Sequence, residues 1–122
     1  MTVDARALVA IARKEPGFEG LVAQVVEDEN PRVCATAVAE AAIILSIRGD
    51  WMSQLTLDVM IGQLGITVVP FTQDHWRAAV DAYQRGIKAG ASPAPAFGRC
   101  LSVAVAARLG APLIEWTIAP LP

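Results

Sequence analysis

Hydrophobic residues recur along this chain in two patterns, short β-branched runs and longer stretches with a helical period. The short runs predict strands at residues 1–4, 32–35, 66–69 and 112–116. Stretches with an apolar residue at every third or fourth position predict helices over residues 5–14, 18–28, 36–48, 51–64, 72–88 and 97–109. A Gly- and Pro-rich loop separates the last two helices. Strands that alternate with helices in this way are typical of a parallel sheet covered by helices.

Cap and turn residues indicate where these elements begin and end. Thr36 and Thr72 are expected to cap the helices that follow them, because a hydroxyl oxygen can accept a hydrogen bond from a free backbone N–H. Glu40 is then expected in the first turn of its helix. Gly65 and Gly110 follow the last apolar residue of two helices and should end them in a left-handed conformation.

The composition is more apolar than that of an ordinary soluble domain. Hydrophobic residues make up 54% and charged residues 18% of the 122 positions, a length that fits one domain spanning residues 1–122. No apolar run approaches the roughly 20 residues of a membrane-spanning helix, and the N-terminus lacks the pattern of a signal peptide. We therefore expect no membrane segment, and we expect the surplus apolar surface to form a partner site.

Cysteine, charge and histidine content limit the kinds of site that the chain can form. Cys34 and Cys100 are too few for a disulfide framework and have apolar neighbours, which favours buried free thiols and a reducing cytoplasm, with one bridge between them still open. A formal charge of -2 provides no long-range attraction for nucleic acid, so any contact with RNA would have to be local. His75 is the only histidine, which excludes a pair of histidine ligands within one chain.

Three charged residues are expected at one edge of the predicted sheet. Ligands of parallel sheets collect at the carboxyl ends of the strands. Asp4 ends the first strand, Glu40 lies early in the helix after the second strand, and Arg99 lies early in the last helix. Two carboxylates at such an edge could hold a hard cation such as Mg²⁺ together with water and phosphate. The alternative is that Arg99 pairs with both acids in an ion cluster that needs no metal.

Several ordered segments resemble PIN-domain ribonucleases of the VapC toxin type. They are the acids Asp4 and Glu40, the Val-Val-Pro-Phe strand exit at 68–71, the Phe-Gly-x-Cys element at 97–100 and the Leu-Gly-Ala-Pro-Leu turn at 109–113. The resemblance covers nearly the whole chain and implies a PIN-like α/β/α sandwich with a central parallel sheet of four or five strands. It also implies Mg²⁺- or Mn²⁺-dependent endonucleolytic cleavage of RNA, a homodimer and a VapB-like antitoxin partner.

The chain departs from the family pattern at its charged positions. By resemblance, Asp4 and Glu40 match catalytic, metal-binding acids, whereas Arg99 stands where the family carries a third acid. A guanidinium group stays protonated, cannot ligate a divalent ion and repels it. Arg6 occupies a position where the family commonly has a small hydroxyl residue, so Arg6 and Arg99 are candidates for substrate binding. Glu115 is the one late acid that could substitute for the missing ligand.

Two functions follow from this pattern. The first is a toxin–antitoxin ribonuclease whose activity is weakened or lost, with Mg²⁺ or Mn²⁺ as its cofactor if it is active. The second is a catalytically degenerate binding module that keeps the dimer and antitoxin surfaces, in which Arg99 could mimic an arginine that an antitoxin inserts. Trp51, Met52, Leu55 and Val59 could present an apolar helix face to a partner, or they could complete the core.

Overall fold

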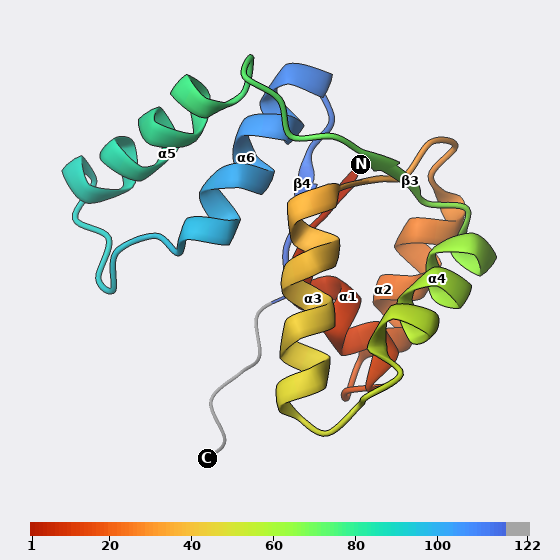
Figure 1. Cartoon of the computed structure of the whole chain (residues 1–122). Helices are drawn as coiled ribbons and strands as arrows, with labels where there is room; N and C mark the ends of the chain where they lie inside the picture. Colours follow the sequence, from red (N-terminus) through yellow and green to blue (C-terminus); the bar gives the residue numbers. More distant parts are fainter. Residues whose placement is uncertain (117–122) are drawn as a thin grey trace.

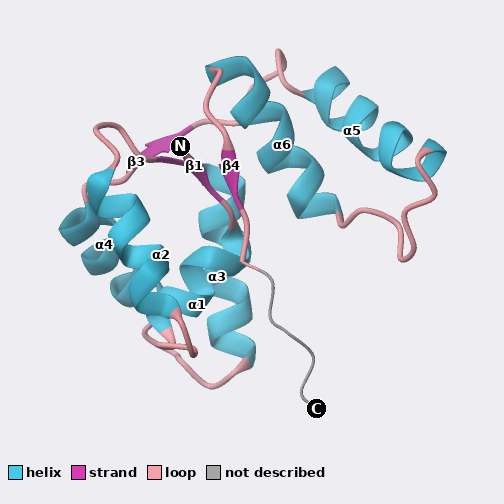
Figure 2. Ribbon diagram, turned by 180° about the vertical axis from the view of Figure 1, so that it is seen from behind, coloured by secondary structure: helices cyan, strands magenta, loops and turns pink. Residues whose placement is uncertain are grey.

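Four short strands build one parallel sheet at the centre of the molecule. A computed structural model describes residues 1–116 and shows the strands in the order β3-β2-β1-β4 (Figures 1 and 2). Val3 on the central strand lies opposite Val33 and Ile114 on its neighbours, and Val3 and Val33 are fully buried. The strands are β1 (Thr2–Val3), β2 (Arg32–Cys34), β3 (Thr67–Val69) and β4 (Leu113–Ile114).

Six helices connect and cover these strands. They are α1 (Ala5–Ala12), α2 (Phe18–Glu27), α3 (Ala35–Ile47), α4 (Ser53–Leu64), α5 (Trp76–Lys88) and α6 (Phe97–Leu109). Figures 1 and 2 show α1 to α4 grouped together, with the strands between this group and the α5–α6 pair. The predicted α/β class and four-stranded parallel sheet are confirmed, with element ends that differ by a few residues. Residues 1–116 contain no fifth strand.

Helix α1 lies at the centre of the helix group and fixes the position of Asp4. It is apolar on nearly all sides, and Ala7, Leu8 and Ala10 are completely buried. A short helix that is apolar all round can only be stable inside the core. Because α1 follows β1 without a loop, Asp4 is held at their junction, between the buried Val3 and the buried first turn of the helix.

The predicted cap of α3 is wrong. The helix begins at Ala35, directly after β2, and Cys34 is its N-cap residue without a side-chain cap hydrogen bond. Thr36 therefore lies inside the first turn, where its hydroxyl is 3.0 Å from Cys34 Sγ. Glu40 consequently lies two residues further into the helix than predicted, in the second turn. The strand runs into the helix without the separate capping residue that the sequence pattern indicated.

The cap predicted for α5 is also wrong, whereas the predicted glycine ends are confirmed. Thr72 belongs to a turn that precedes the helix: its backbone N–H donates to His75 Nδ1 at 2.9 Å, and α5 begins only at Trp76. Gly65 and Gly110 end α4 and α6 with φ values of 67° and 64°, a conformation that a glycine adopts without steric cost.

Both cysteines behave as core residues. Cys34 and Cys100 are buried and free, as predicted, so no bridge joins them. Within residues 1–116, none of the helices has the length and apolar content that crossing a membrane would require.

Candidate functional site

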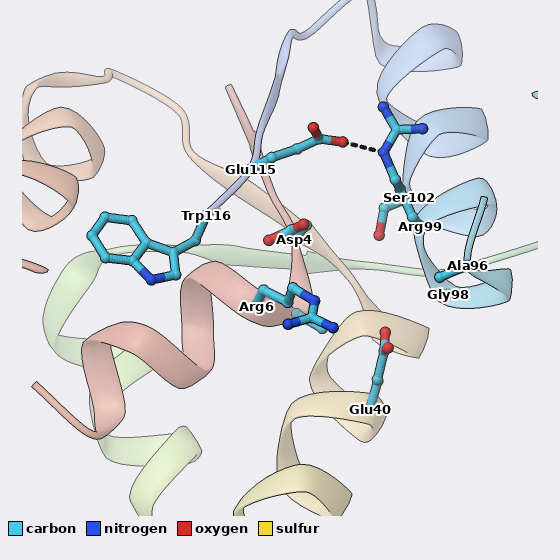
Figure 3. A pocket seen from close by; sticks show the side chains of 10 residues that line it. Asp4, Arg6, Glu40, Ala96, Gly98, Arg99, Ser102, Glu115 and Trp116 are labelled. Atoms are coloured by element: carbon cyan, nitrogen blue, oxygen red, sulfur yellow. Dashed lines mark hydrogen bonds and ion pairs between the residues drawn. The ribbon is translucent and has the colours of Figure 1, made fainter. Parts of the chain in front are cut away.

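A cleft with a volume of about 330 Å³ opens at the carboxyl edge of the sheet. Side chains from the β1–α1 junction, from α3, from α6 and from the residues after β4 meet there (Figure 3). The structure thus brings together all five charged residues that the sequence singled out, together with a serine, a tryptophan and small residues. The charged cleft is lined by Asp4, Ala5, Arg6, Glu40, Ala96, Gly98, Arg99, Ser102, Glu115 and Trp116.

Asp4 is the most deeply placed carboxylate of the charged cleft. The residue is 8% exposed, and its Oδ1 accepts a hydrogen bond from the backbone N–H of Ala7 at 2.9 Å, which caps α1. The pKa of Asp4 is raised from 3.8 to about 6, chiefly by burial. The cap hydrogen bond from Ala7 and the positive charge of Arg6 lower this pKa, whereas the negative charges of Glu115 and Glu40 raise it. Asp4 therefore titrates close to neutral pH.

Glu40 reaches the charged cleft because the first turn of α6 contains a glycine, Gly98. A Cβ atom added to Gly98 would come within 2.8 Å of Glu40 Cδ and would overlap with the carboxylate oxygens. The carboxylate therefore lies directly against the first turn of α6, whose N-cap residue Ala96 supplies no side-chain hydrogen bond. Gly98 is a positioning residue that the sequence analysis missed, because only the contact between α3 and α6 distinguishes it from an ordinary helix-end glycine.

The partner of Arg99 is Glu115. Arg99 Nε donates a hydrogen bond to Glu115 Oε1, and the two side chains form an ion pair at the mouth of the charged cleft. Figure 3 shows the guanidinium group of Arg99 turned toward Glu115 and away from Glu40. The predicted pairing of Arg99 with Asp4 and Glu40 is therefore wrong. Helix α6 packs beside β4, so the residue that follows β4 reaches Arg99 while Asp4 stays deeper in the cleft.

Arg6 is the second cation of the charged cleft. It extends from the first turn of α1 into the space between Asp4 and Glu40 (Figure 3), and its positive charge favours the ionised form of Asp4. The cleft thus holds three carboxylates and two guanidinium groups, which leaves one net negative charge. The two arginines supply as much positive charge as one divalent cation would.

This donor set does not fit a divalent metal ion as the side chains are placed. One oxygen of Asp4 already caps α1, and Glu115 is engaged by Arg99. Within residues 1–116, no three His, Cys, Asp or Glu side chains converge closely enough to hold a metal. Hard cations such as Mg²⁺ need several oxygen ligands, and the guanidinium groups compete with them for the carboxylates. The metal ligation implied by the resemblance therefore lacks its donor set here.

The family follows from comparison with known proteins. Residues 1–117 match the PIN domain family. The chain belongs to the PIN-domain family. It is 31% identical to the VapC ribonuclease Mb2004c of Mycobacterium bovis over 107 residues, which cover 87% of this chain and 77% of that protein. It is also 31% identical to the ribonuclease VapC of Mycolicibacterium smegmatis over 114 residues, 93% of this chain and 88% of that protein. These relatives place this PIN-domain chain in the VapC group.

Solved structures support the same fold. VapC20 of Mycobacterium tuberculosis, described as a toxin that cleaves the sarcin-ricin loop, superposes with a TM-score of 0.72 at 16% identity and covers 90% of this chain and 83% of its own. VapBC2 of Rickettsia felis, bound to a DNA fragment from its promoter, gives a TM-score of 0.73 at 13% identity over 93% of this chain and 85% of its own. The PIN-like α/β/α fold of this chain is thus confirmed.

Proposed function

We propose that this chain is the VapC-type member of a toxin–antitoxin system and that its ribonuclease activity is weak or lost. The observation that carries the proposal is the ion pair between Arg99 and Glu115. It places a fixed positive charge in the charged cleft and engages the one acid that could have replaced the missing ligand. The RNA-cleaving activity named for the relatives belongs to proteins that are about a third identical to this one.

The charges of the cleft explain why we favour weak or absent ribonuclease activity. Two acids of the cleft, Asp4 and Glu40, remain where the family resemblance expects metal-binding acids. Arg6 points between them and Arg99 neutralises Glu115, so each carboxylate has a protein cation within the same cleft. An arriving divalent ion would have to break the Arg99–Glu115 ion pair and would be repelled by both guanidinium groups.

One observation favours an active enzyme as the second candidate. Asp4, Glu40 and Glu115 line a single cleft, so a rotation of the exposed Arg99 side chain would release a third carboxylate without moving the backbone. Side chains at the surface change rotamer readily. In that case the chain would be a metal-dependent endoribonuclease that uses Mg²⁺ or Mn²⁺.

An RNA cleavage assay separates these candidates. We expect the natural chain, supplied with Mg²⁺ or Mn²⁺, to cleave ribosomal RNA and single-stranded oligoribonucleotides no faster than a Glu40→Gln variant does. This is the expected result because Glu40 would have no metal to hold. Metal-dependent cleavage by the natural chain that disappears in Glu40→Gln would establish the active enzyme instead.

The proposal also includes a VapB-like antitoxin, which fits an exposed apolar patch on α3 and α4. Trp51 is 85% exposed and Leu55 is 54% exposed, so the alternative that they complete the core is wrong. Exposed apolar patches of this kind mark interaction sites. Asp58 is exposed on α4, the helix that carries Leu55, which suits an amphipathic partner helix with basic residues beside its apolar stripe. The α3–α4 patch consists of Ile43, Ile47, Trp51, Met52, Leu55 and Val59.

A peptide titration tests this surface. A synthetic amphipathic helix with leucines on one face and lysines beside them should bind the natural chain, and Trp51→Glu should weaken that binding about tenfold or more because it places a charge at the centre of the patch. Tyr83→Glu, a matched change on exposed α5, should leave the affinity unaltered. Equal affinity of the peptide for the natural chain and for Trp51→Glu would rule out the α3–α4 patch as its binding site.

A further inference from the structure

Trp116, the residue after Glu115, ties the exit of β4 to a turn that lies 101 positions earlier in the chain. Its indole N–H donates a hydrogen bond to Glu15 Oε2 at 3.2 Å, in the turn between α1 and α2, and its ring packs against the hydrophobic core. Figure 3 shows Glu115 pointing toward Arg99 and the Trp116 ring pointing away from it. The two neighbouring side chains thus leave the chain on opposite sides, as side chains of an extended segment do.

Glu15 is the acceptor for the Trp116 indole. Its side chain is only 16% exposed, and its two carboxylate oxygens have different partners. Oε1 lies 3.4 Å from a guanidinium nitrogen of Arg48 at the end of α3, and Oε2 accepts the indole N–H of Trp116. A carboxylate that is largely removed from water is costly unless it is paired and hydrogen-bonded. Both contacts of Glu15 are therefore favoured, and the indole is held at a defined place.

Gly17 leaves room for the edge of the indole ring. A Cβ atom added to Gly17 would lie 3.1 Å from Trp116 Cη2, which is tighter than ordinary van der Waals contact. The residue also has a φ of 89°, a left-handed conformation that a glycine adopts without steric cost. The turn is thus shaped to receive the ring. We define the Trp116 anchor as the contacts of Trp116 with Glu15 and Gly17, supported by Arg48.

The backbone of Glu115 is held on both sides. Before it, β4 pairs with β1, and Ile114 O accepts a hydrogen bond from the Asp4 N–H at 3.3 Å. After it, Trp116 is fixed by its anchor. This matters because the side chains of Arg99 and Glu115 are 47% and 38% exposed, and an exposed ion pair loses most of its attraction to solvent and to the ordering of two long side chains. A fixed backbone reduces the freedom that Glu115 has to lose.

We propose that Trp116 is a positioning residue whose anchor keeps the Glu115 carboxylate within reach of Arg99. The anchor thereby maintains the ion pair that fills the mouth of the charged cleft, and in this consequence the inference rests on the proposed function. Without the anchor, the residue after β4 would be tethered on one side only, and Glu115 would leave Arg99 for much of the time. The alternative is that Trp116 only covers the core, in which case its loss would lower stability and leave the ion pair unchanged.

The Nε–H group of Arg99 reports on this contact directly, because it is the donor to Glu115. Its proton–nitrogen NMR signal is assigned by its loss in Arg99→Lys, and its exchange with water is slow while the hydrogen bond is closed. Trp116→Leu should accelerate this exchange about tenfold, since the open form of the contact would become about ten times more populated. Trp51→Leu makes the same substitution at an exposed tryptophan outside the charged cleft and should leave the exchange rate as it is.

A pair of variants at Glu15 tests the anchor without touching the core. Glu15→Gln keeps an oxygen that can accept the indole N–H and should retain slow exchange at Arg99, whereas Glu15→Leu should accelerate it as Trp116→Leu does. Circular dichroism establishes that each variant is folded, and the Glu15 pair decides the question if Trp116→Leu does not fold. Unchanged exchange in folded Trp116→Leu and Glu15→Leu, or equal acceleration by Trp51→Leu, would overturn the proposal.

This measurement uses neither RNA nor metal, so its outcome is separate from that of the cleavage assay. Metal-dependent RNA cleavage by a natural chain whose Arg99 Nε–H exchanges slowly, and faster in Trp116→Leu, would overturn the proposed function and leave the positioning role intact. Slow exchange that neither Trp116→Leu nor Glu15→Leu alters would overturn the positioning role alone.

Discussion

Replacement of Arg99 with aspartate is expected to make the charged cleft bind Mn²⁺ about a hundredfold more tightly than the natural chain does. The substitution changes the local charge by two units, and at about 6 Å from a divalent ion in the dielectric of water this amounts to about 3 kcal/mol. It also releases Glu115 from its ion pair, so four carboxylates would surround the cleft in place of three. Both effects act in the direction of metal binding.

Titration calorimetry with Mn²⁺ measures this gain. Arg108→Asp is the matched control, because it makes the same charge change at an exposed position in the last turn of the same helix, outside the charged cleft. That variant should show no more heat of binding than the natural chain. If Arg99→Asp and Arg108→Asp gave the same weak response, Arg99 would not be the residue that disfavours the metal.

Asp4→Asn is expected to stabilise the fold by about 2 kcal/mol at pH 8. Burial raises the pKa of Asp4 in the folded protein to about 6, whereas the unfolded chain ionises near the ordinary value of 3.8. Between these values the folded state holds more protons, so the free energy of unfolding falls as the pH rises from about 4 to about 6 and stays at the lower value above that range. A shift of about two pKa units corresponds to about 3 kcal/mol, which contact with solvent in the cleft reduces.

The asparagine side chain removes the charge and keeps the cap. Its oxygen can accept the hydrogen bond from the Ala7 N–H as Asp4 Oδ1 does, and asparagine is as good an N-cap residue as aspartate. Urea denaturation of the natural chain and of Asp4→Asn at several pH values measures the difference. The variant should lose the decline between pH 4 and pH 6. If the free energy of unfolding of the natural chain rose through this range as much as that of the variant, ionisation of Asp4 would not destabilise the fold.

The same comparison bears on function, because a buried acid that costs stability is typical of a site retained for its chemistry. The negative charge of Glu40 raises the pKa of Asp4, and both acids line the charged cleft. The charged cleft thus combines two acids that the family resemblance names with two arginines. This combination of charges supports the proposal that the ribonuclease activity is weak or lost.

Local sequence determined most of the elements and their order. The periods of the apolar residues identified every helix and strand, because burial of one face or of a whole element leaves a regular pattern along the chain. The parallel order of short strands also predicted that Asp4, Glu40 and Arg99 would share one edge.

Only the tertiary structure decided how the charged residues pair and which apolar residues stay exposed. Arg99 and Glu115 are 16 positions apart, and their contact depends on how α6 packs beside β4, which no local pattern encodes. The close approach of Glu40 to Gly98 likewise depends on the distance between two helices. Trp51 satisfies the period of the helix predicted over residues 51–64, yet it lies in the turn before α4 and is exposed. A period specifies one face of an element, and only the packing of neighbouring elements decides whether that face is covered.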